Sequence, residues 1–294
     1  LLTTILMATK AGVLIAPSMN VHMFENPILQ ENIGKLKALG YHFIEPTEGY
    51  LACGYEGKGR LPEPEDILEE IRRLLKKKDL IDERLLITAG PNQEPLDPVR
   101  YVSNRSSGKM GYALTRVGLR RGAKVTLVSG PTSLVPPSGA RLISVRTAAE
   151  MREAVLQEFA NATAVVMAAA VADYRPEQYV SKKLKRAEGP IVLKLQPNPD
   201  ILRELGERKN GRILIGFAAE TEALVKNATK KLREKHLDLI VANDVTQEGS
   251  GFEGDTNAAT LMDRKGAVHS LPLMSKEELA DRIYDYLIEI RNSR

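Results

Sequence analysis

The stretch RLLITAGPNQEPLDPVRYVSNRSSGKMG, residues 84–111, decides the fold. Its run LLITA is short, apolar and uninterrupted, which is typical of a strand buried on both faces of a parallel sheet. A long loop follows, and after Ser107 apolar residues recur at helical spacing until Gly122, which predicts an amphipathic helix. A second apolar strand, 123–131, comes next. This strand–helix–strand order predicts a parallel sheet covered by helices.

The same alternation continues toward the end of the chain. Thr147 and Glu150 form a capping box that predicts a helix over 148–160, and a hairpin and a helix follow at 258–273 and 275–290. We therefore predict an α/β fold, with a Rossmann-like parallel sheet and helices on both faces. Ligands of such sheets bind beyond the carboxyl ends of the strands. The loops to examine are those after Ala89, Ala169, Phe217 and Ala242.

The first 75 residues form a separate and shorter pattern. Apolar strands are predicted at 11–17 and 41–46, followed by a glycine-rich loop and a helix over 64–78. Two strands cannot cover a parallel sheet, and the chain opens on LLTTILMATK, without an initiator Met or a capping residue. We therefore expect that an upstream part of this domain is missing. The predicted organisation is a domain at 1–75, a charged linker at 76–84 and a domain at 85–294.

The composition excludes several classes of protein. Of the 294 residues 43% are apolar, which is enough for a buried core and argues against disorder. The formal net charge is only +4, Trp is absent and Phe and Tyr are few, which disfavours nucleic-acid binding. No apolar run reaches the ~20 residues that a membrane span needs. A single cysteine excludes an intrachain disulfide, so we expect a cytoplasmic protein that binds neither nucleic acid nor membrane.

The loop that ends in SSGK is interpreted as an anion site. Free backbone N–H groups from Ser107 to Lys109 would open a helix, where the helix dipole favours anions, and the side chains of Ser106, Ser107 and Lys109 add donors. The loop lacks the first glycine of a P-loop and the three-glycine Rossmann spacing. A helix merely capped by serine is the alternative, and this loop alone does not separate the two.

Three later loops carry further polar or aromatic residues at the same edge. Asp173 follows one strand, and the run KKLKR at 182–186 places four cations in five residues, which favours a polyphosphate clamp over a solvated surface. Phe217 ends another strand, where it either packs in the core or stacks on a base. The next helix presents Lys231 and Lys235 on one face. The loop after Ala242 is dense in residues that also suit plain turns: Asn243, Asp244, Phe252, Asp255 and Asn257.

In this order, the motifs resemble the phosphopantothenate–cysteine ligase domain of the bacterial bifunctional coenzyme A biosynthesis family. They are ITAGPNQEPLDPVRYVSNRSSGKMG, AAAVADYRP, KLKR, NPDI, GFAAET and ANDV with GFEGDTN, and they span essentially all of 85–294. In the first part, PSMNVHM (17–23) and ACGYEGKGRLPEPEDI (52–67) resemble the Pro-x-Met-Asn motif and the substrate clamp of that family's phosphopantothenoylcysteine decarboxylase. The resemblance implies a partial flavodoxin-like domain at 1–75.

The resemblance implies a two-step ligation with CTP as co-substrate. The carboxylate of 4′-phosphopantothenate attacks the α-phosphate of CTP, and the amine of cysteine then displaces CMP from the acyl-cytidylate. By the family's motifs, Lys183 acts in forming that intermediate and Asn104 handles it. Mg²⁺ would bridge the phosphates, with no protein ligand assigned. The implied nucleotide contacts are Ala168, Ala169, Asp173, Lys183, Asn198, Pro199, Asp200, Ile201, Phe217, Lys231 and Lys235.

The resemblance also implies a flavin enzyme in the first part. Cys53 matches the reactive cysteine of the decarboxylase and Asn20 matches its substrate and flavin site, with FMN as cofactor. That decarboxylase needs a further histidine, which none of the four histidines here matches. We therefore expect the chain to make phosphopantothenoylcysteine without decarboxylating it. The family implies a homodimer through the ligase domain and a higher homo-oligomer in the intact protein.

Three other interpretations stay open from the residues alone. A nicotinamide oxidoreductase would need Gly-x-Gly-x-x-Gly at the first turn, where the chain has TAGPNQ. A nucleic-acid-binding module would use the basic stretches and show steep salt dependence without CTP turnover. A flavin-binding module formed by 1–75 within an oligomer would give a yellow protein.

Overall fold

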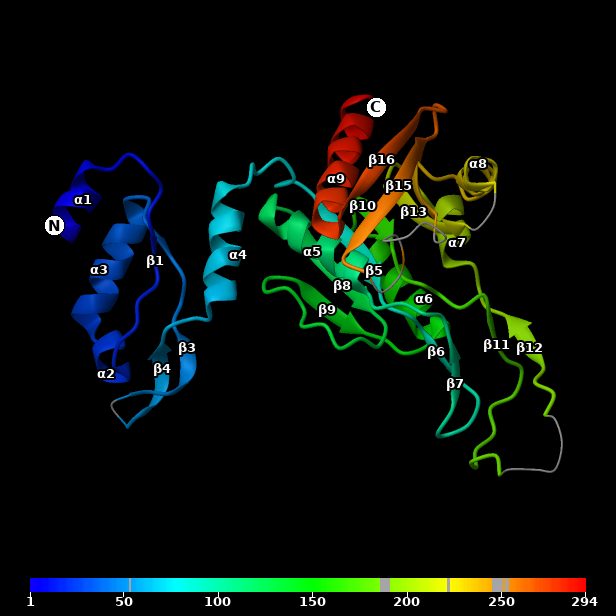
Figure 1. Cartoon of the computed structure of the whole chain (residues 1–294), viewed down its shortest axis with the longest axis horizontal. Helices are drawn as coiled ribbons and strands as arrows, with labels where there is room; N and C mark the ends of the chain where they lie inside the picture. The colour runs from blue at the N-terminus through cyan, green and yellow to red at the C-terminus, as the bar shows by residue number, and fades with distance from the viewer. Residues whose placement is uncertain (53, 186–190, 221–222, 245–250, 252–253) are drawn as a thin grey trace. The chain divides into compact units, whose positions relative to one another are not determined.

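The structure is a computed structural model that describes residues 1–294 apart from residue 53 and residues 186–190, 221–222, 245–250 and 252–253. The chain divides into two compact units, Leu1–Lys76 and Lys77–Arg294. Figure 1 labels the helices and strands of both, and each unit is described by itself. Over the described residues, no helix is both long enough and apolar enough to cross a membrane.

A mostly parallel sheet forms the centre of the second unit. Its strand order is β16-β15-β14-β13-β10-β5-β8-β9, with parallel pairing from β14 to β9 and antiparallel pairing of β15 and β16 at one edge. This confirms the predicted α/β fold. The strands are β5 (Arg84–Ala89), β8 (Lys124–Ser129), β9 (Arg141–Ser144), β10 (Ala164–Met167), β13 (Ile213–Glu220), β14 (Leu239–Asp244), β15 (Thr256–Asp263) and β16 (Val268–Ser275).

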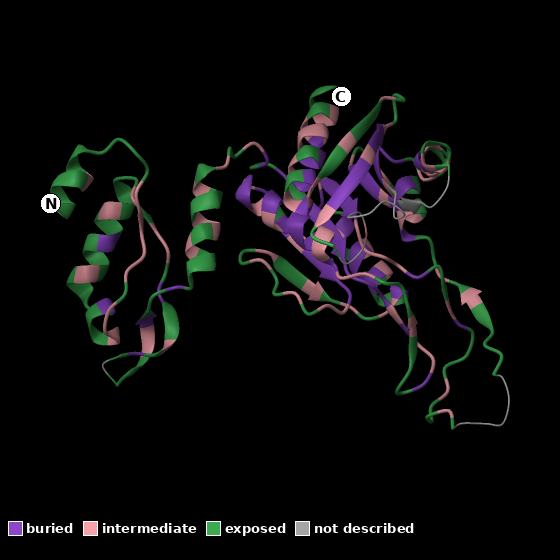
Figure 2. Ribbon diagram, in the orientation of Figure 1, coloured by how far each residue is buried: buried purple, intermediate pink, exposed green. Residues whose placement is uncertain are grey.

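Helices cover both faces of this sheet, as predicted. Successive residues of a strand point to opposite faces: Leu85 and Ile87 pack with α5 (Lys109–Arg120) and α9 (Lys276–Asn292), whereas Leu86 packs in the core on the other face. Figure 2 shows the resulting core as buried residues along the strands and the inner sides of the helices. The helices on the second face are α6 (Ala148–Phe159), α7 (Ile201–Glu207) and α8 (Leu224–Glu234).

Two of these helices begin at capping boxes. Thr147 and Glu150 make the predicted box at α6, and Ser275 and Glu278 make another at α9. Each box satisfies backbone donors that the first helical turn leaves without a partner. The start of α9 at Lys276 is therefore fixed.

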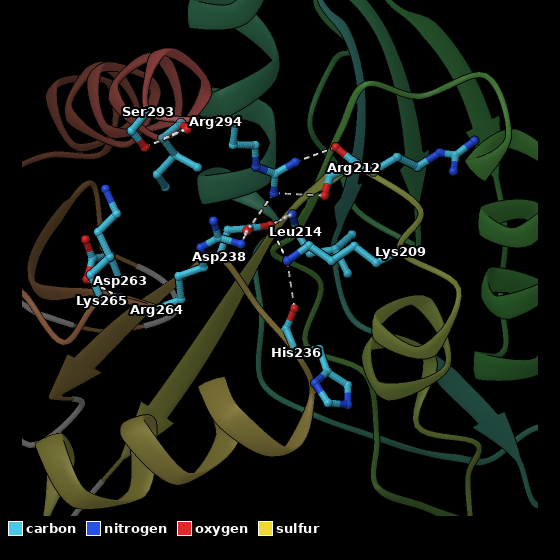
Figure 3. Close-up of polar contacts among 12 residues, drawn as sticks. Lys209, Arg212, Leu214, His236, Asp238, Asp263, Arg264, Lys265, Ser293 and Arg294 are labelled. Carbon is cyan, nitrogen blue, oxygen red and sulfur yellow. Dashed lines mark hydrogen bonds and ion pairs between the residues drawn. The ribbon is translucent and has the colours of Figure 1, made fainter.

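A buried carboxylate lies at the amino end of the sheet (Figure 3). Asp238 directly precedes β14 and is fully buried. It accepts a hydrogen bond from the N–H of Leu214 at 2.8 Å, and its oxygens lie 2.6 Å from Nζ of Lys209 and 2.6 Å from the guanidinium of Arg294. The guanidinium of Arg264 lies 3.7 Å away. Donors from several elements therefore converge on one side chain.

Two short hairpins extend from the carboxyl end of the sheet, where the sequence predicts only loops (Figure 1). β6 (Gln93–Pro95) pairs with β7 (Tyr101–Ser103), and β11 (Tyr174–Pro176) pairs with β12 (Leu195–Pro197). We call the chain from 174 to 197 the arm. The N–H of Val180 in the arm donates to the carbonyl of Leu96 at 3.0 Å, so the two hairpins are linked.

The first unit contains two small sheets. β1 (Leu14–Ile15) pairs in parallel with β2 (His42–Phe43), so both predicted strands exist but are shorter than expected. β3 (Thr47–Tyr50) pairs antiparallel with β4 (Glu56–Arg60), so the predicted glycine-rich loop is in fact a hairpin. The helices are α1 (Leu2–Ala8), α2 (Val21–Phe24), α3 (Pro27–Ala38) and α4 (Pro64–Leu75).

Candidate functional site

A pocket of about 500 Å³ opens at the carboxyl ends of β10, β13 and β14. This is the edge at which parallel sheets bind their ligands. Asn104 lines it, and so do all the residues that the resemblance assigns to the nucleotide except Lys183, although they come from segments far apart in the sequence: Ala168, Ala169, Asp173, Asn198, Pro199, Asp200, Ile201, Phe217, Lys231 and Lys235.

Close packing of α5 on β5 places the SSGK loop at this edge. A Cβ on Gly111 would lie 2.4 Å from the Cβ of Ala89 and 2.9 Å from the carbonyl oxygen of Thr88, so only glycine allows this approach. The N-cap residue Gly108 has φ of +78°, a left-handed conformation that glycine adopts without strain. The loop therefore reaches the pocket through Ser106, Gly108 and Lys109.

The backbone donors of this loop are not free, which corrects the prediction. The N–H of Gly108 donates to Oγ of Ser106 at 3.3 Å, and the N–H of Lys109 donates to Oγ of Ser107 at 3.5 Å. Both bonds are long, so a ligand anion can replace the hydroxyl oxygens at modest cost. The serine hydroxyls thus bind the loop's own backbone, whereas α5 begins at Gly108 without a side-chain cap, and the loop still lines the pocket.

Asn104 bridges two of the pocket loops. Its Nδ2 donates to the carbonyl of Val171 at 3.1 Å and to that of Ala170 at 3.4 Å. These bonds engage the donor side of the amide, which the resemblance implies acts on the acyl-cytidylate. In this conformation, Asn104 positions the loop after β10, and contact with a substrate would require it to exchange these bonds.

The turn at 198–201 is held by its own polar groups. Nδ2 of Asn198 donates to the carbonyl of Ala172 at 2.8 Å, while its Oδ1 accepts from Arg175 at 2.9 Å. Asp200 accepts from the N–H of Arg203 at 3.1 Å as the N-cap of α7, and it also forms an ion pair with Lys235 at 2.9 Å. These side chains therefore set the shape of the pocket wall as well as its charge.

The structure does not bring Lys183 into the pocket: of the described residues, those that line it do not include this lysine, which is exposed on the arm. A buried carboxylate instead holds the neighbouring residue. Asp97, 3% exposed, accepts from the N–H of Leu184 at 3.1 Å, and Arg100 donates to the carbonyl of Leu184 at 2.6 Å. Asp97 and Arg100 are themselves paired at 2.6 Å.

The hydrogen bonds at Asp97 dominate its ionisation. Burial alone would raise the pKa of this carboxyl. The N–H groups of Val99, Leu184 and Arg100 and the guanidinium of Arg100 outweigh burial and hold the pKa of Asp97 well below its usual range. Asp97 is therefore charged throughout the neutral range, and it fixes the arm next to Lys183.

Lys276 was not predicted from the sequence to be part of the site. This lysine is the first residue of α9, it is 5% exposed, and it lines the pocket. Burial lowers its pKa, the cation of Lys109 lowers it further, and Asp255 acts in the opposite sense. A signal was present: a cation in the first turn of a helix opposes the helix dipole, and the first turn of α9 otherwise carries the acids Glu277 and Glu278.

Two asparagines complete the pocket wall. Asn257, 3% exposed, and Asn243 both line the pocket. Within the part of the chain that the structure describes, Oδ1 of Asn243 is buried and accepts no hydrogen bond. An unpaired buried acceptor costs about 1–3 kcal/mol, so a ligand donor at this place would stabilise the protein. Both residues had been noted in the sequence, without a role.

The first unit brings together the two segments that resemble decarboxylase motifs. The N–H of Met19 donates to the carbonyl of Gly59 at 2.9 Å, which joins the 17–23 segment to the β3–β4 hairpin. The rings of His22 and Tyr55 lie 5.3 Å apart, edge to face. Oδ1 of Asn20 accepts from the N–H of His22 at 2.8 Å and caps α2. Three residues named in the sequence analysis lie outside the described residues: Cys53, Arg186 and Phe252.

The described residues do not contain a cluster of three or more His, Cys, Asp or Glu side chains that could hold a metal ion. Of the carboxylates that line the pocket, Asp200 is paired with Lys235, and the lining lysine Lys109 is paired with Asp255. The pocket therefore offers positive charge and amides, which suit an anionic ligand. Its position is that of the ligand site in the class of α/β proteins that bind small molecules at the carboxyl edge of a parallel sheet.

Comparisons with known proteins agree with this class. Residues 80–290 match the family model described as "DNA/pantothenate metabolism flavoprotein C-terminal domain", and residues 1–76 match the family model "Flavoprotein". The chain belongs to the family of coenzyme A biosynthesis bifunctional proteins that join these two parts. This confirms the resemblance seen in the sequence.

Three relatives illustrate the match. The coenzyme A biosynthesis bifunctional protein CoaBC of Bacillus subtilis (strain 168) is 49% identical over 287 residues, covering 96% of this chain and 71% of the relative. A protein named cysteine/cysteine sulfinic acid decarboxylase, from an unknown prokaryotic organism, is 44% identical over 287 residues, covering 95% of this chain and 80% of that one. The crystal structure of the C-terminal domain of a CoaBC protein is 44% identical, with a TM-score of 0.65, and covers 74% of this chain and 100% of its own.

Proposed function

We propose that the second unit is a CTP-dependent phosphopantothenate–cysteine ligase of coenzyme A biosynthesis. The observation that carries this proposal is the pocket, which gathers at one edge of the sheet the residues that the family's motifs assign to the nucleotide. Relatives named for coenzyme A biosynthesis, one of them a solved structure of the matching domain, support the same function.

The first step joins a carboxylate to phosphorus. A carboxylate oxygen of 4′-phosphopantothenate bonds to the α-phosphorus of CTP, and the bond from that phosphorus to the bridging oxygen breaks, so that pyrophosphate leaves with the electron pair. Such a step needs positioning and charge neutralisation rather than a protein nucleophile. The pocket suits it, because its described lining residues include no His or Cys but do include Lys109, Lys231, Lys235 and Lys276.

The second step forms the amide. The amine of cysteine attacks the acyl carbon of the acyl-cytidylate, the bond from that carbon to the phosphate oxygen breaks, and CMP leaves while the nitrogen loses a proton. We assign Asn104 to this step, since it holds the backbone of the loop after β10 through Ala170 and Val171. It would orient the intermediate either through that loop or by exchanging those bonds for the acyl group.

The pocket fits CTP in size and in chemistry. A volume of about 500 Å³ lies within the range of small-molecule sites. The ring of Phe217 lies at the pocket wall and offers a stacking surface for a base, and Oδ1 of Asn243 offers an acceptor for an amino group. Asp173 also lines the pocket, and its carboxylate would accept hydrogen bonds from sugar hydroxyls or from a base amine.

Magnesium fits the site as a partner of the phosphates. Since the described residues hold no cluster of three metal-binding side chains, the ion would be bound mainly by phosphate oxygens and water, as is usual for Mg²⁺ at nucleotides. When bound there, it would neutralise phosphate charge. The chain's own contribution is the lysines that line the pocket.

We propose that residues 1–75 are part of the family's decarboxylase, with Asn20 and Cys53 at its substrate site, that 76–84 is a linker and that 85–294 is the ligase. FMN is the cofactor that the family model implies. The described residues of the first unit do not by themselves fit it, because strands β1 and β2 of two residues each give no extended parallel edge. We therefore derive no step through the flavin.

Pyrophosphate release tests the ligase. The purified chain is mixed with CTP, Mg²⁺ and 4′-phosphopantothenate, with and without cysteine. We expect at most one pyrophosphate per site without cysteine and continuous turnover with it, and no release when 4′-phosphopantothenate is omitted. Asn104→Asp should release pyrophosphate but accumulate the acyl-cytidylate. Wild-type protein that releases no pyrophosphate under either condition would contradict the proposal.

A further inference from the structure

Two helices begin with a lysine at the same corner of the pocket. Lys109 is the first residue of α5 and Lys276 is the first residue of α9. The N-terminus of a helix carries a partial positive charge, so a cation in its first turn is unfavourable. Two such placements at one site add their positive charges to those of two helix ends.

Among the described residues, Asp255 lies next to both lysines. Oδ1 of Asp255 lies 2.7 Å from Nζ of Lys109, and this contact lowers the pKa of Asp255. The N–H of Lys276 donates to the carbonyl of the same aspartate at 3.0 Å, and the two side chains attract each other. Two ammonium groups and two helix N-termini concentrate positive charge at this corner, which suits a phosphate group of the ligand.

The side chains of Lys276 and Asp255 differ in how strongly their positions are held. Lys276 is 5% exposed, and its Nζ donates to the carbonyls of Gly251, at 3.2 Å, and of Gly254. Moving the side chain of Lys276 away would expose a buried site to water and break these hydrogen bonds. The side chain of Asp255 is 88% exposed, so its ion pair with Lys109 is worth little and breaks readily.

We propose that Lys109 and Lys276 bind a phosphate group of the ligand and that Asp255 occupies this place until the phosphate arrives. The proposal rests on the ligase function proposed above. Lys276 acts as the fixed cation, Lys109 changes its partner from carboxylate to phosphate, and Asp255 turns to solvent. The phosphate comes either from the triphosphate of CTP or from the 4′-phosphate of phosphopantothenate, which share this chemistry.

Substitution of Lys276 is the first test. Titration calorimetry measures the binding of CTP, of pyrophosphate and of 4′-phosphopantothenate separately, and the ligand whose affinity falls is the source of the phosphate. Lys276→Met should weaken that ligand about 10- to 100-fold, the scale of one hydrogen bond to a charged group. Lys276→Arg should recover much of the loss. Lys265→Met is the matched control, because Lys265 is an exposed lysine in the turn between β15 and β16.

Asp255→Asn is the second test, and it has the opposite sign. Removing the competing carboxylate should tighten the same ligand by up to about 5-fold, as expected for an exposed ion pair. If Asp255 instead binds Mg²⁺, the variant will weaken CTP only when Mg²⁺ is present, and the proposal is wrong. Because this variant changes only an exposed side chain, it also decides the matter if Lys276→Met fails to fold.

The outcomes separate this inference from the ligase proposal. An active wild-type enzyme whose Lys276→Met variant binds all three ligands normally would refute the phosphate site and leave the ligase intact. A wild-type chain that releases no pyrophosphate but loses pyrophosphate affinity on Lys276→Met would support the phosphate site and refute the ligase.

Discussion

The buried polar groups at the two ends of strand β14 differ in their hydrogen bonding. Asp238, directly before the strand, receives donors from Leu214, Lys209 and Arg294 (Figure 3). Asn243, near the end of the same strand, keeps a buried oxygen without a hydrogen bond among the described residues. The amino end therefore serves stability, since its carboxylate is fully paired. The carboxyl end leaves hydrogen-bonding capacity for a ligand, at a cost to the unliganded fold.

The same difference is seen in the lysines. Burial lowers the pKa of Lys209, and the hydrogen bond with Asp238 opposes that effect. Burial also lowers the pKa of Lys276, but the nearby Lys109 lowers it further. Lys209 contacts a fully buried carboxylate, whereas the carboxylate near Lys109 and Lys276 is exposed and can give way to a ligand anion.

The largest effect is expected at the amino end. Asp238→Ala leaves the partly buried Lys209 without its carboxylate and the buried N–H of Leu214 without its acceptor, so the free energy of unfolding of the second unit should fall by about 3 kcal/mol. Urea denaturation measures this change. The double variant Asp238→Ala with Lys209→Met should recover part of it, because it removes a stranded charge. A loss below about 1 kcal/mol would show that the two ends do not differ as described.

A catalytic effect is expected at the arm. Lys183→Gln should lower pyrophosphate release by ~10²-fold or more at saturating CTP, because a fixed cation beside the α-phosphate acts mainly in the transition state. Lys182→Gln is the control and should cost far less. An unchanged maximal rate with a raised CTP requirement would make Lys183 a binding residue. Since Lys183 is exposed in this structure, the arm must move toward the pocket for this role.

At Asn243, a smaller effect is expected, with opposite signs for stability and for CTP affinity. Asn243→Ala removes the unpaired oxygen, so the unliganded protein should be as stable as wild type or more stable by up to about 1 kcal/mol, while CTP affinity falls about 10-fold. Thermal unfolding with and without CTP measures both. Asn292→Ala, at an exposed asparagine, is the control. If the unliganded variant is less stable than wild type, the side chain of Asn243 stabilises the fold as Asp238 does, and the contrast between the two ends of β14 is wrong.

The smallest effect is expected at Asp97. Asp97→Asn weakens the hold on Leu184, so trypsin should cut after Lys182, Lys183 and Lys185 several-fold faster, while Glu177→Gln on the same arm changes nothing. The folded-state pKa is depressed, so the stabilisation is present above the unfolded pKa of about 3.9 and is lost only as pH falls below it. Equal cleavage of wild type and Asp97→Asn at pH 7 would contradict this role.

The central sheet was predictable because its strands are apolar on both faces and stand out as continuous runs, as in LLITA. β9 was missed because it lies half exposed at the edge of the sheet, with little apolar signal. The hairpins β6–β7 and β11–β12 are three-residue pairings, and such pairings depend on the partner strand rather than on local pattern. The sequence around these short strands has no repeating pattern of apolar residues from which they could be predicted.

The site was predictable to the extent that the family's motifs name its residues. The pocket holds Asn104, Asp173 and Phe217 as expected, but the expected role of Lys183 depends on a conformation other than this one. Lys276 escaped notice because burial of a lysine is a tertiary property. The N–H groups of Gly108 and Lys109 were wrongly expected to be free, since serine hydroxyls compete locally for backbone donors.

Gly111 lets α5 approach within contact of Ala89, and this has a consequence for the variation that the protein can tolerate. The missing side chain sets the spacing between the start of α5 and the end of β5, and thereby the place of the SSGK loop. A library randomised at this position and selected for ligation should return glycine alone. A matched library at Gly34, where a Cβ would meet nothing within 4 Å, should return many residue types.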